Sequence, residues 1–144
     1  MSDTVYSFKD YNINIVSPLG SYSVQGEGIG SATVTMSTTK SVHSVGADGS
    51  VMTSKIAGDN GTIAIQVQQT SGLNTYMTKL YNLLKTAPSS VWTSTQILIT
   101  NSVQKEVVTA IGCSPENLAE KPMQAEGQMI TWTWLAQNIQ QVAL

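Results

Sequence analysis

Residues 40–56 read KSVHSVGADGSVMTSKI, and this stretch is the strongest indication of the fold. Two short arms flank the turn sequence GADGS at residues 46–50. The Asp48-Gly49 pair is a strong hairpin signal, because both residue types tolerate positive φ angles. The arms are only weakly amphipathic, with single valines among Ser, Thr and Lys55. Because a two-stranded ribbon is marginally stable by itself, the sequence predicts either a mobile flap or a hairpin that docks on something else.

Short alternating segments on both sides of this hairpin predict further β-strands. Alternation with a period of two places one set of side chains on a packed face and the other set on the opposite face. The pattern occurs at residues 12–15, 31–37, 62–68, 96–100, 107–111 and 128–135. In the last segment Trp132 and Trp134 share one face. Core packing is the favoured interpretation of this pair, and a platform for sugars or bases and a subunit contact are the alternatives.

One segment, residues 72–87, has the pattern of an amphipathic helix. Ser71 can cap its start, and Pro88 stops it. Apolar residues recur with the spacing i, i+3, i+4, i+7 at Leu73, Tyr76, Met77, Leu80, Tyr81, Leu84 and Ala87. The packing core assigned to the helix is Tyr76, Met77, Leu80 and Leu84. The side assigned to water is Asn74, Thr78, Asn82 and Lys85.

The order of elements indicates a mainly β or α+β fold. Strands are followed by one helix and then by further strands, which argues against a parallel, doubly wound sheet. A short capped helical turn is also expected at residues 114–116, which read SPE, because Pro is favoured at the first helical position.

The composition describes a single domain, residues 1–144, with an unusually neutral surface. Charged residues make up 11% of the chain, against roughly 25% in typical soluble domains. Arg is absent, the net charge is −2, and Ser, Thr, Asn and Gln together number 53. This disfavours specific nucleic-acid binding. So little charge suggests that other subunits cover much of the surface, although polar uncharged residues could also keep a monomer soluble.

Several other classes of protein are excluded. No apolar run approaches the roughly 18 residues of a membrane span, so no stable membrane association is expected. The start, MSDTVYSFKDY, lacks the basic and apolar regions of a signal peptide. Cys113 is the single cysteine, which excludes a disulfide scaffold within the chain.

No group of residues has a catalytic or metal-binding pattern. The glycine cluster at residues 26–30 lacks the third Gly and the helix of a dinucleotide fingerprint, so a bend or bulge before a strand is predicted. His43 has no carboxylate nearby in sequence to orient it, and Cys113 is expected to be a small buried thiol. Metal-ligand spacing is absent from Glu116, Glu120 and Glu126. We therefore expect a structural protein rather than an enzyme, without cofactors or metals.

Three stretches resemble the tail tube proteins of contractile-tailed bacteriophages. They are HSVGADGSV at residues 43–51, GTIAI at residues 61–65, and QTS at residues 69–71 with the helix that follows. The similarity extends from about residue 10 to about residue 140. It implies two packed β-sheets, as a sandwich or barrel, with a flanking helix, a fold shared with the haemolysin-coregulated protein of type VI secretion.

The resemblance also implies how the subunits assemble. Members of this family form hexameric rings that stack into a hollow tube, and each subunit contributes strands to an inner β-barrel that runs between subunits. The extended hairpin, here residues 40–61, reaches a neighbouring ring, and residues 1–10 form an N-terminal arm. The residues assigned to hairpin assembly are Lys40, His43, Asp48, Gly49, Ser50 and Lys55.

The expected function is therefore a structural virion protein of the inner tail tube, the conduit for DNA ejection through the host envelope. Expected partners are further copies of the chain, the tail sheath, tape measure, baseplate and tail terminator proteins, and double-stranded DNA in transient passage. A lumen with few cations fits this passage, because each neutralised phosphate adds affinity. The expected location is the virion tail, after assembly in the host bacterial cytoplasm. The alternatives are the tube of a tailocin or a type VI-like injection machine, and a monomeric β-sandwich that binds glycans.

Overall fold

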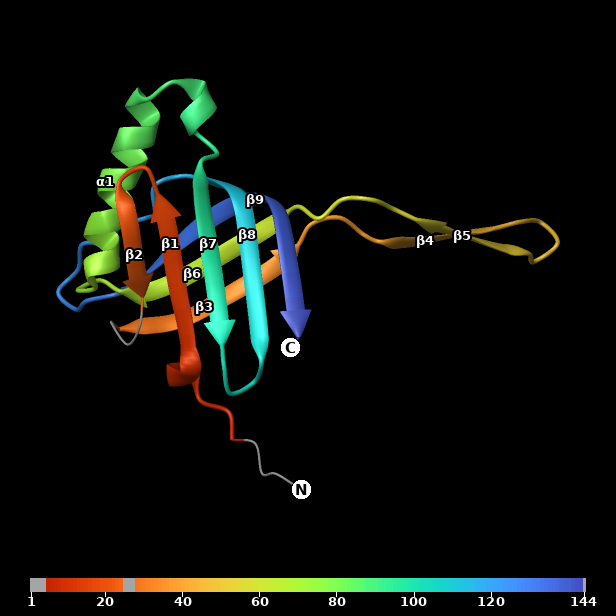
Figure 1. Cartoon of the computed structure of the whole chain (residues 1–144), viewed down its shortest axis with the longest axis horizontal. Coiled ribbons are helices and arrows are strands. Elements are labelled where there is room, and N and C mark those ends of the chain that lie inside the picture. The colour runs from red at the N-terminus through yellow and green to blue at the C-terminus, as the bar shows by residue number, and fades with distance from the viewer. Residues whose placement is uncertain (1–4, 25–27, 144) are drawn as a thin grey trace.

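The chain folds into a curled β-sheet, a projecting β-hairpin and a long helix (Figure 1). The computed structural model describes residues 5–24 and 28–143. The strands are β1 (Tyr11–Ser17), β2 (Gly20–Val24), β3 (Ile29–Met36), β4 (Ser41–Val45), β5 (Val51–Lys55), β6 (Gly61–Gln68), β7 (Thr95–Asn101), β8 (Glu106–Pro115) and β9 (Met129–Ala143). The helix α1 spans Gly72–Thr86, and 3-10 turns occur at Phe8–Asp10 and Ser89–Val91. Within the described residues, the prediction of a mainly β chain with one α-helix is confirmed.

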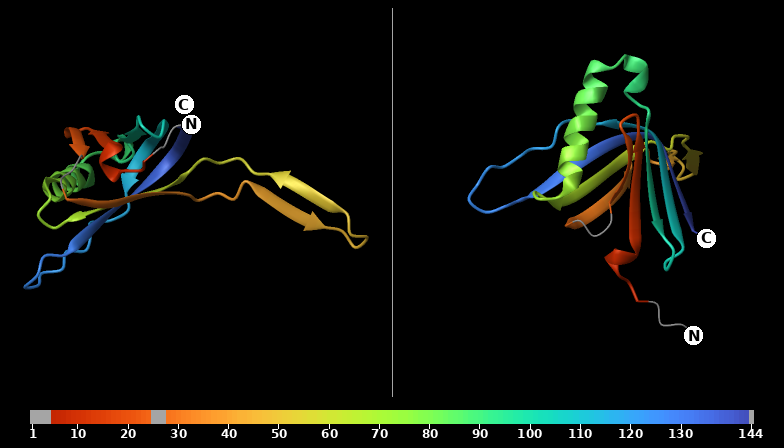
Figure 2. Two further views of the ribbon diagram at one scale, coloured as in Figure 1. Left: turned by 90° about the horizontal axis from the view of Figure 1, so that it is seen from below. Right: turned by 60° about the vertical axis from the view of Figure 1, so that its left-hand side comes forward.

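Seven strands form one antiparallel sheet in the order β2-β1-β7-β8-β9-β6-β3. The long strand β9 pairs with β6 through its first half and with β8 through its second half. Because the sheet curls, β3 and β6 cross behind β1 and β7, and two layers result (Figure 1 and Figure 2). The two packed sheets of the sequence prediction are thus two layers of a continuous sheet, which β9 joins.

The hydrophobic core lies between these layers and consists of alternating strand residues. On β6, Ile63, Ile65 and Val67 are 0% exposed, and Trp132 and Trp134 of β9 are 3% and 2% exposed. The facing layer contributes Ile13, Ile15, Ile97 and Ile99. The core interpretation of the Trp pair is therefore confirmed, and the glycan-binding alternative loses its platform.

The helix α1 packs on the same core beside β2 (Figure 1). The Ser71 hydroxyl accepts a hydrogen bond from the N–H of Leu73 at 3.2 Å, which is the expected N-cap. At the other end Ala87 is the C-cap, and Pro88 follows it. In the described part of the chain, no helix combines the length and the apolar character that a membrane crossing requires.

The curl of the sheet includes a bulge at Gly112. The pairing of β8 with β7 shifts register there, so that Ala110 and Cys113, three residues apart, are both buried. Gly112 has a φ of +65°, and a Cβ at this position would lie 2.5 Å from Oε1 of Gln137. Both the left-handed backbone and the close approach of β9 therefore favour glycine.

Two segments differ from the sequence prediction. The helical turn expected at residues 114–116 is wrong, because Pro115 continues β8, where it is buried opposite Trp134. Strand β2 was not predicted, since its sequence GSYSV has too few apolar positions to show a pattern. In the glycine cluster, residues 26 and 27 lie outside the described residues, but the register of β3 shifts between Ile29 and Ser31, as expected for a bulge.

Candidate assembly surfaces

The hairpin of β4 and β5 projects from the sheet along the long axis of the molecule (Figure 1 and Figure 2). Five cross-strand pairs join its arms. Every residue from 41 to 53 is exposed, and Val45, Val51 and Met52 are 67%, 57% and 63% exposed. A concentration of exposed apolar side chains on one element is typical of a surface that a partner covers.

A tight turn fixes the tip of the hairpin and contains three of the predicted assembly residues. The Asp48 carboxylate accepts hydrogen bonds from the backbone N–H of Ser50 (3.0 Å) and from its hydroxyl (2.9 Å). These bonds hold the pKa of Asp48 below its ordinary value. Gly49 has a φ of +88°, and its N–H donates to the carbonyl of Gly46 at 3.0 Å. Asp48 and Gly49 therefore shape the tip in different ways, through side-chain hydrogen bonds and through backbone freedom.

Strand pairing assigns each residue of the hairpin to one of its two faces. Residues directly opposite each other in an antiparallel pair lie on the same face. His43 pairs with Thr53, and two positions away Lys55 pairs with Ser41, so His43 and Lys55 share one face. Val42 and Met52, which are 46% and 63% exposed, lie on the other face. Val45 pairs with Val51 on the same face as His43 and Lys55, so exposed apolar side chains occur on both faces of the hairpin.

An ion pair clamps the base of the hairpin to the sheet. The Lys40 ammonium lies 2.8 Å from Oδ1 of Asp59 and also donates to the carbonyl of Gly58. The Asp59 carbonyl accepts from the N–H of Ile139 at 2.7 Å, and Oδ2 accepts from Gln140 at 3.4 Å. Hydrogen bonding to Lys40 holds the pKa of Asp59 below its ordinary value. The structure thus places Lys40, which the sequence assigned to assembly, in a contact within its own chain.

The helix residues assigned to packing divide into two kinds. The fully buried ones are Met77, Leu80 and Leu84. Tyr76 is only partly buried, and its hydroxyl lies 2.6 Å from Oγ of Ser17 and donates to the carbonyl of Gly20 at 2.6 Å. Burial raises the pKa of Tyr76. Its role includes a polar tether between α1 and the β1–β2 turn, which the apolar spacing did not indicate.

Asn74, which was expected to face water, instead joins α1 to the sheet. Its side-chain oxygen accepts a hydrogen bond from the indole N–H of Trp132 at 2.9 Å. Its amide nitrogen donates to the carbonyls of Gln68 and Gln69 at 3.0 and 3.1 Å. The helical pattern alone cannot reveal this contact, because the indole belongs to a strand 58 residues away.

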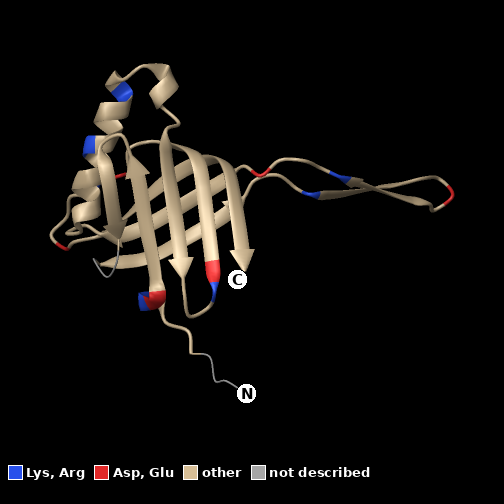
Figure 3. Ribbon diagram, in the orientation of Figure 1, with Lys and Arg blue, Asp and Glu red and all other residues tan. Residues whose placement is uncertain are grey.

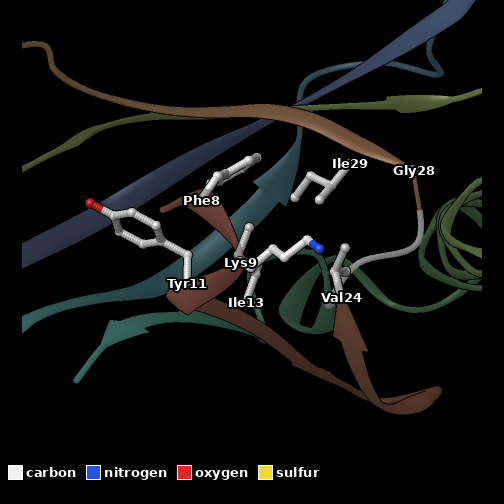
Figure 4. Close-up of a pocket in the computed structure, with 7 residues that line it drawn as sticks. All are labelled: Phe8, Lys9, Tyr11, Ile13, Val24, Gly28 and Ile29. Atoms are coloured by element: carbon white, nitrogen blue, oxygen red, sulfur yellow. The ribbon is translucent and has the colours of Figure 1, made fainter. Parts of the chain in front are cut away.

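A mainly apolar cleft of about 240 Å³ opens between the edge strands β2 and β3. It is lined by Phe8, Lys9, Tyr11, Ile13, Val24, Gly28 and Ile29. Figure 4 shows the Lys9 side chain extending across it with the ammonium group toward Val24. The sequence did not predict this cleft, because it exists only where the two ends of the curled sheet approach each other.

The residues that could carry chemistry do not form a reactive site. Burial raises the pKa of Cys113 to about 12, so the thiol is protonated at neutral pH and is not a nucleophile. His43 is exposed on β4. Among the described residues, no cluster of three or more His, Cys, Asp or Glu could hold a metal ion. The features that stand out are therefore surfaces for contact with other molecules.

Comparison with known proteins agrees with this description. A family model described as Bacteriophage PhiTE tail tube protein matches residues 3–143, whereas no curated protein matches the chain. The solved anti-feeding prophage tube-terminating cap is similar in fold, with a TM-score of 0.65, 8% identity and coverage of 100% of this chain and 95% of that chain. Two structures of an extracellular contractile injection system are also similar. The sheath–tube complex gives a TM-score of 0.63 and 9% identity over 96% and 91% of the two chains. The sheath/tube terminator gives 0.65 and 8% over 99% and 100%.

At such low identities the solved structures establish only a shared fold, and the family model carries the assignment. A mainly β chain with a long exposed hairpin and no reactive cluster in its described part fits a structural tube component. Because the match spans nearly the whole sequence, the chain belongs to the bacteriophage PhiTE tail tube protein family.

Proposed function

We propose that this chain assembles into stacked hexameric rings that form the inner tube of a contractile tail. The tube is the conduit for DNA during ejection through the host envelope, and its role is mechanical rather than enzymatic. The observation that carries this proposal is the hairpin, which projects from the sheet (Figure 1) and whose apolar side chains are exposed in the single chain. The open edges β2 and β3 support it as well, because ring closure removes edges that would otherwise pair without control.

The outer face of β3, β6 and β9 has the chemistry expected of a non-adhesive lumen. Its cross-strand rows are Ser31–Gln66–Thr131, Thr33–Ala64–Thr133 and Thr35–Thr62–Leu135. These rows contain no charged side chain, and Figure 3 shows that the strands of this layer are free of charge. Because cations that neutralise phosphates create salt-dependent affinity, a face of hydroxyl and amide groups lets a DNA duplex slide. We assign this face to the lumen.

The dimensions of such a tube suit a DNA duplex. Six subunits that each contribute four strands give a barrel of about 24 strands, with a circumference near 115 Å at roughly 4.8 Å per strand. The backbone diameter is then roughly 37 Å before strand tilt, and side chains reduce it by about 10 Å. In this arrangement β3, β6, β9 and the end of β8 are the four contributed strands.

The remaining partners follow from the position of the tube in the particle. We propose that the tail sheath surrounds it, that the tail terminator and baseplate proteins bind its ends, and that the tape measure protein occupies its lumen before DNA does. The solved structures of similar fold come from a sheath–tube complex, a sheath/tube terminator and a baseplate, and this supports the proposed partners. The tube is assembled in the host bacterial cytoplasm and resides in the virion tail. Particles that contain this chain and no genome would instead identify a tailocin or another injection machine.

Electron microscopy and sedimentation of the purified full-length chain test the tube directly. We expect rings or tubes with six-fold symmetry above a threshold concentration. A species that remains monomeric at every concentration, together with the absence of this chain from tubular parts of the virion, would overturn the proposal.

The role of the hairpin is tested by deleting residues 47–50. The tip is exposed and lies outside the core, so we expect unchanged cooperative unfolding but impaired stacking of rings. Asp48→Pro is expected to act in the same direction, because it removes the turn hydrogen bonds. Unchanged tube length in both variants would remove the hairpin from the stacking contact.

The lumen assignment predicts that an added cation causes tubes to retain DNA when it lies on the lumen face but not when it lies on α1. Wild-type tubes should retain no duplex DNA at physiological salt, whereas tubes of Thr33→Lys should retain it in a salt-dependent manner. Asn82→Lys on the exposed side of α1 is the matched control. Equal retention by the two variants would contradict the assignment.

A further inference from the structure

We infer that the loop between β8 and β9, residues 116–128, is the receptor for the hairpin of a second copy of this chain. The inference rests on the proposed stacking and goes further, because it identifies the surface of the neighbouring subunit that the hairpin contacts. Four features of the molecule support it: the position of the loop, its anchoring, its exposed apolar residues and its charge.

The loop and the hairpin lie at opposite ends of the long axis of the molecule (Figure 1 and Figure 2). The hairpin follows the end of β3 and precedes β6, so it leaves one end of this sheet layer. The loop leads into β9 at the other end, beside the start of β3 and the end of β6. In a head-to-tail stack of identical copies, a protrusion at one end meets the opposite end of the next copy. The loop is therefore placed to receive the hairpin.

Hydrogen bonds hold the loop in a defined shape although it has no helix or strand. The Gln69 amide donates to the carbonyl of Pro122 at 2.9 Å and accepts from the N–H of Gln128 at 3.0 Å. The Lys121 ammonium donates to the Thr78 hydroxyl of α1 at 3.2 Å. A loop of this length that is held by side chains is typical of a functional segment, and its fixed shape lowers the entropy lost on binding.

Exposed apolar residues occur on both protrusions. On the loop side, Met123 is 88% exposed, and Leu118 and Met129 are each 40% exposed. On the hairpin, Val45 and Met52 are exposed by more than half. Methionine adapts its shape to a partner surface, and burial of such side chains against each other removes both sets from water.

The hairpin arm that carries Lys55 and the loop have charges of opposite sign. On the hairpin arms, Lys40 is paired with Asp59, whereas Lys55 has no carboxylate partner in the described part of the chain. Asp48 at the tip is bonded to the neutral Ser50 and keeps its negative charge. On the loop, three acidic residues have no cationic partner among the described residues and outnumber the one cation there, Lys121; they are Glu116, Glu120 and Glu126. Figure 3 shows cationic residues on the hairpin arms, an acidic one at the hairpin tip and acidic ones on the loop at the far end. The unpaired cation on the hairpin arm and the unpaired carboxylates of the loop favour contact between the arm and the loop.

Charge reversal on separate copies tests this contact. We would prepare two full-length proteins, one with Lys55→Glu and one with Glu120→Lys and Glu126→Lys. Each alone brings like charges together in the stack, and we expect the concentration needed for tube assembly to rise about tenfold. In an equal mixture, rings can alternate so that every hairpin meets a loop of opposite charge, and assembly should return to near the wild-type threshold.

The mixture distinguishes a contact between copies from one within a chain, because only the former is rescued when the two changes reside on different molecules. Lys79→Glu on the exposed side of α1 makes the same charge change as Lys55→Glu and should assemble normally. Normal assembly of either reversed protein, or a mixture no better than its components, would overturn the receptor assignment while wild-type tubes still support the proposed function. A wild-type chain that stays monomeric would instead overturn the proposed tube itself.

Discussion

The hairpin β4–β5 and the central strand β6 both contain β-branched apolar residues but place them in opposite environments. In both, these residues lie among polar ones, although only on β6 do they alternate regularly. On β6 the apolar set, Ile63, Ile65 and Val67, is 0% exposed, whereas on the hairpin Val45 and Val51 are 67% and 57% exposed. The difference arises from what surrounds each strand, since β6 pairs with strands on both sides and the hairpin pairs only with itself.

This contrast separates the energetics of folding from those of assembly. The curled sheet and α1 bury their apolar residues within the chain, so changes there alter the free energy of unfolding. The hairpin adds little to that free energy, because its side chains are exposed in the folded chain and in the unfolded chain alike. Its contribution is expected where a second copy covers it.

The largest expected effect is that of Leu80→Asp on α1. Leu80 is 0% exposed, and burial of an unpaired carboxylate in the core is strongly unfavourable. We expect loss of cooperative unfolding by circular dichroism. Leu83→Asp, at a position that is 39% exposed on the same helix, is the matched control and should remain folded. A native-like Leu80→Asp protein would show that this face of α1 does not pack on the core.

A direct comparison of the two regions uses Ile65→Ala on β6 and Val51→Ala on the hairpin. We expect Ile65→Ala to lower the free energy of unfolding by about 2–5 kcal/mol, because it leaves a cavity in the core. We expect Val51→Ala to change it by less than about 0.5 kcal/mol, as at other exposed sites, but to raise the concentration needed for assembly. Denaturant titration measures the free energy of unfolding of both variants. Equal destabilisation would contradict the distinction between the two regions.

The parts of the fold that sequence could predict are those determined by local pattern. Period-two alternation located β6 and β9, helical spacing with Ser71 and Pro88 bounded α1, and Asp48-Gly49 marked the hairpin tip. In each case the residues that carry the signal lie within one element, so no knowledge of distant partners is needed.

The features that sequence missed depend on contacts between distant segments. Pro115 was assigned to a helical turn because Pro favours that position, but pairing opposite Trp134 keeps it in β8. Asn74 lies on the polar side of α1 in sequence, and its partner is known only once β9 is placed against the helix. The same limit applies to the assembly residues. Lys40 was assigned to assembly, and only the structure shows that it forms an ion pair with Asp59 of its own chain.

A smaller effect is expected from Tyr76→Phe, which keeps the ring and removes the tether to the β1–β2 turn. Loss of a hydroxyl that contacts Ser17 and Gly20 should lower the free energy of unfolding by about 0.5–1.5 kcal/mol. Tyr81→Phe is the control, because the Tyr81 ring contacts Trp92 at 6.2 Å between centroids, and its hydroxyl has no hydrogen bond within the described residues. If both variants unfold at the same denaturant concentration, the tether contributes nothing measurable.

The smallest effect is expected at the junction of the two regions, where Lys40 and Asp59 clamp the hairpin base. The pKa of Asp59 is held below its ordinary value by hydrogen bonding to Lys40, so the clamp is complete above the ordinary pKa of an Asp and is lost as the pH falls through the lowered value. Protonation of Asp59 should therefore loosen the hairpin base while the core stays folded.

Lys40→Met should return the pKa of Asp59 toward normal, as measured by NMR titration of the carboxyl carbon. Lys55→Met, which removes a lysine without a carboxylate partner in the described part of the chain, should leave that pKa unchanged. Faster hydrogen exchange at the Ile56 amide, which donates to the Lys40 carbonyl at 2.8 Å, should accompany the first change and not the second, because only the first releases the hairpin from the sheet.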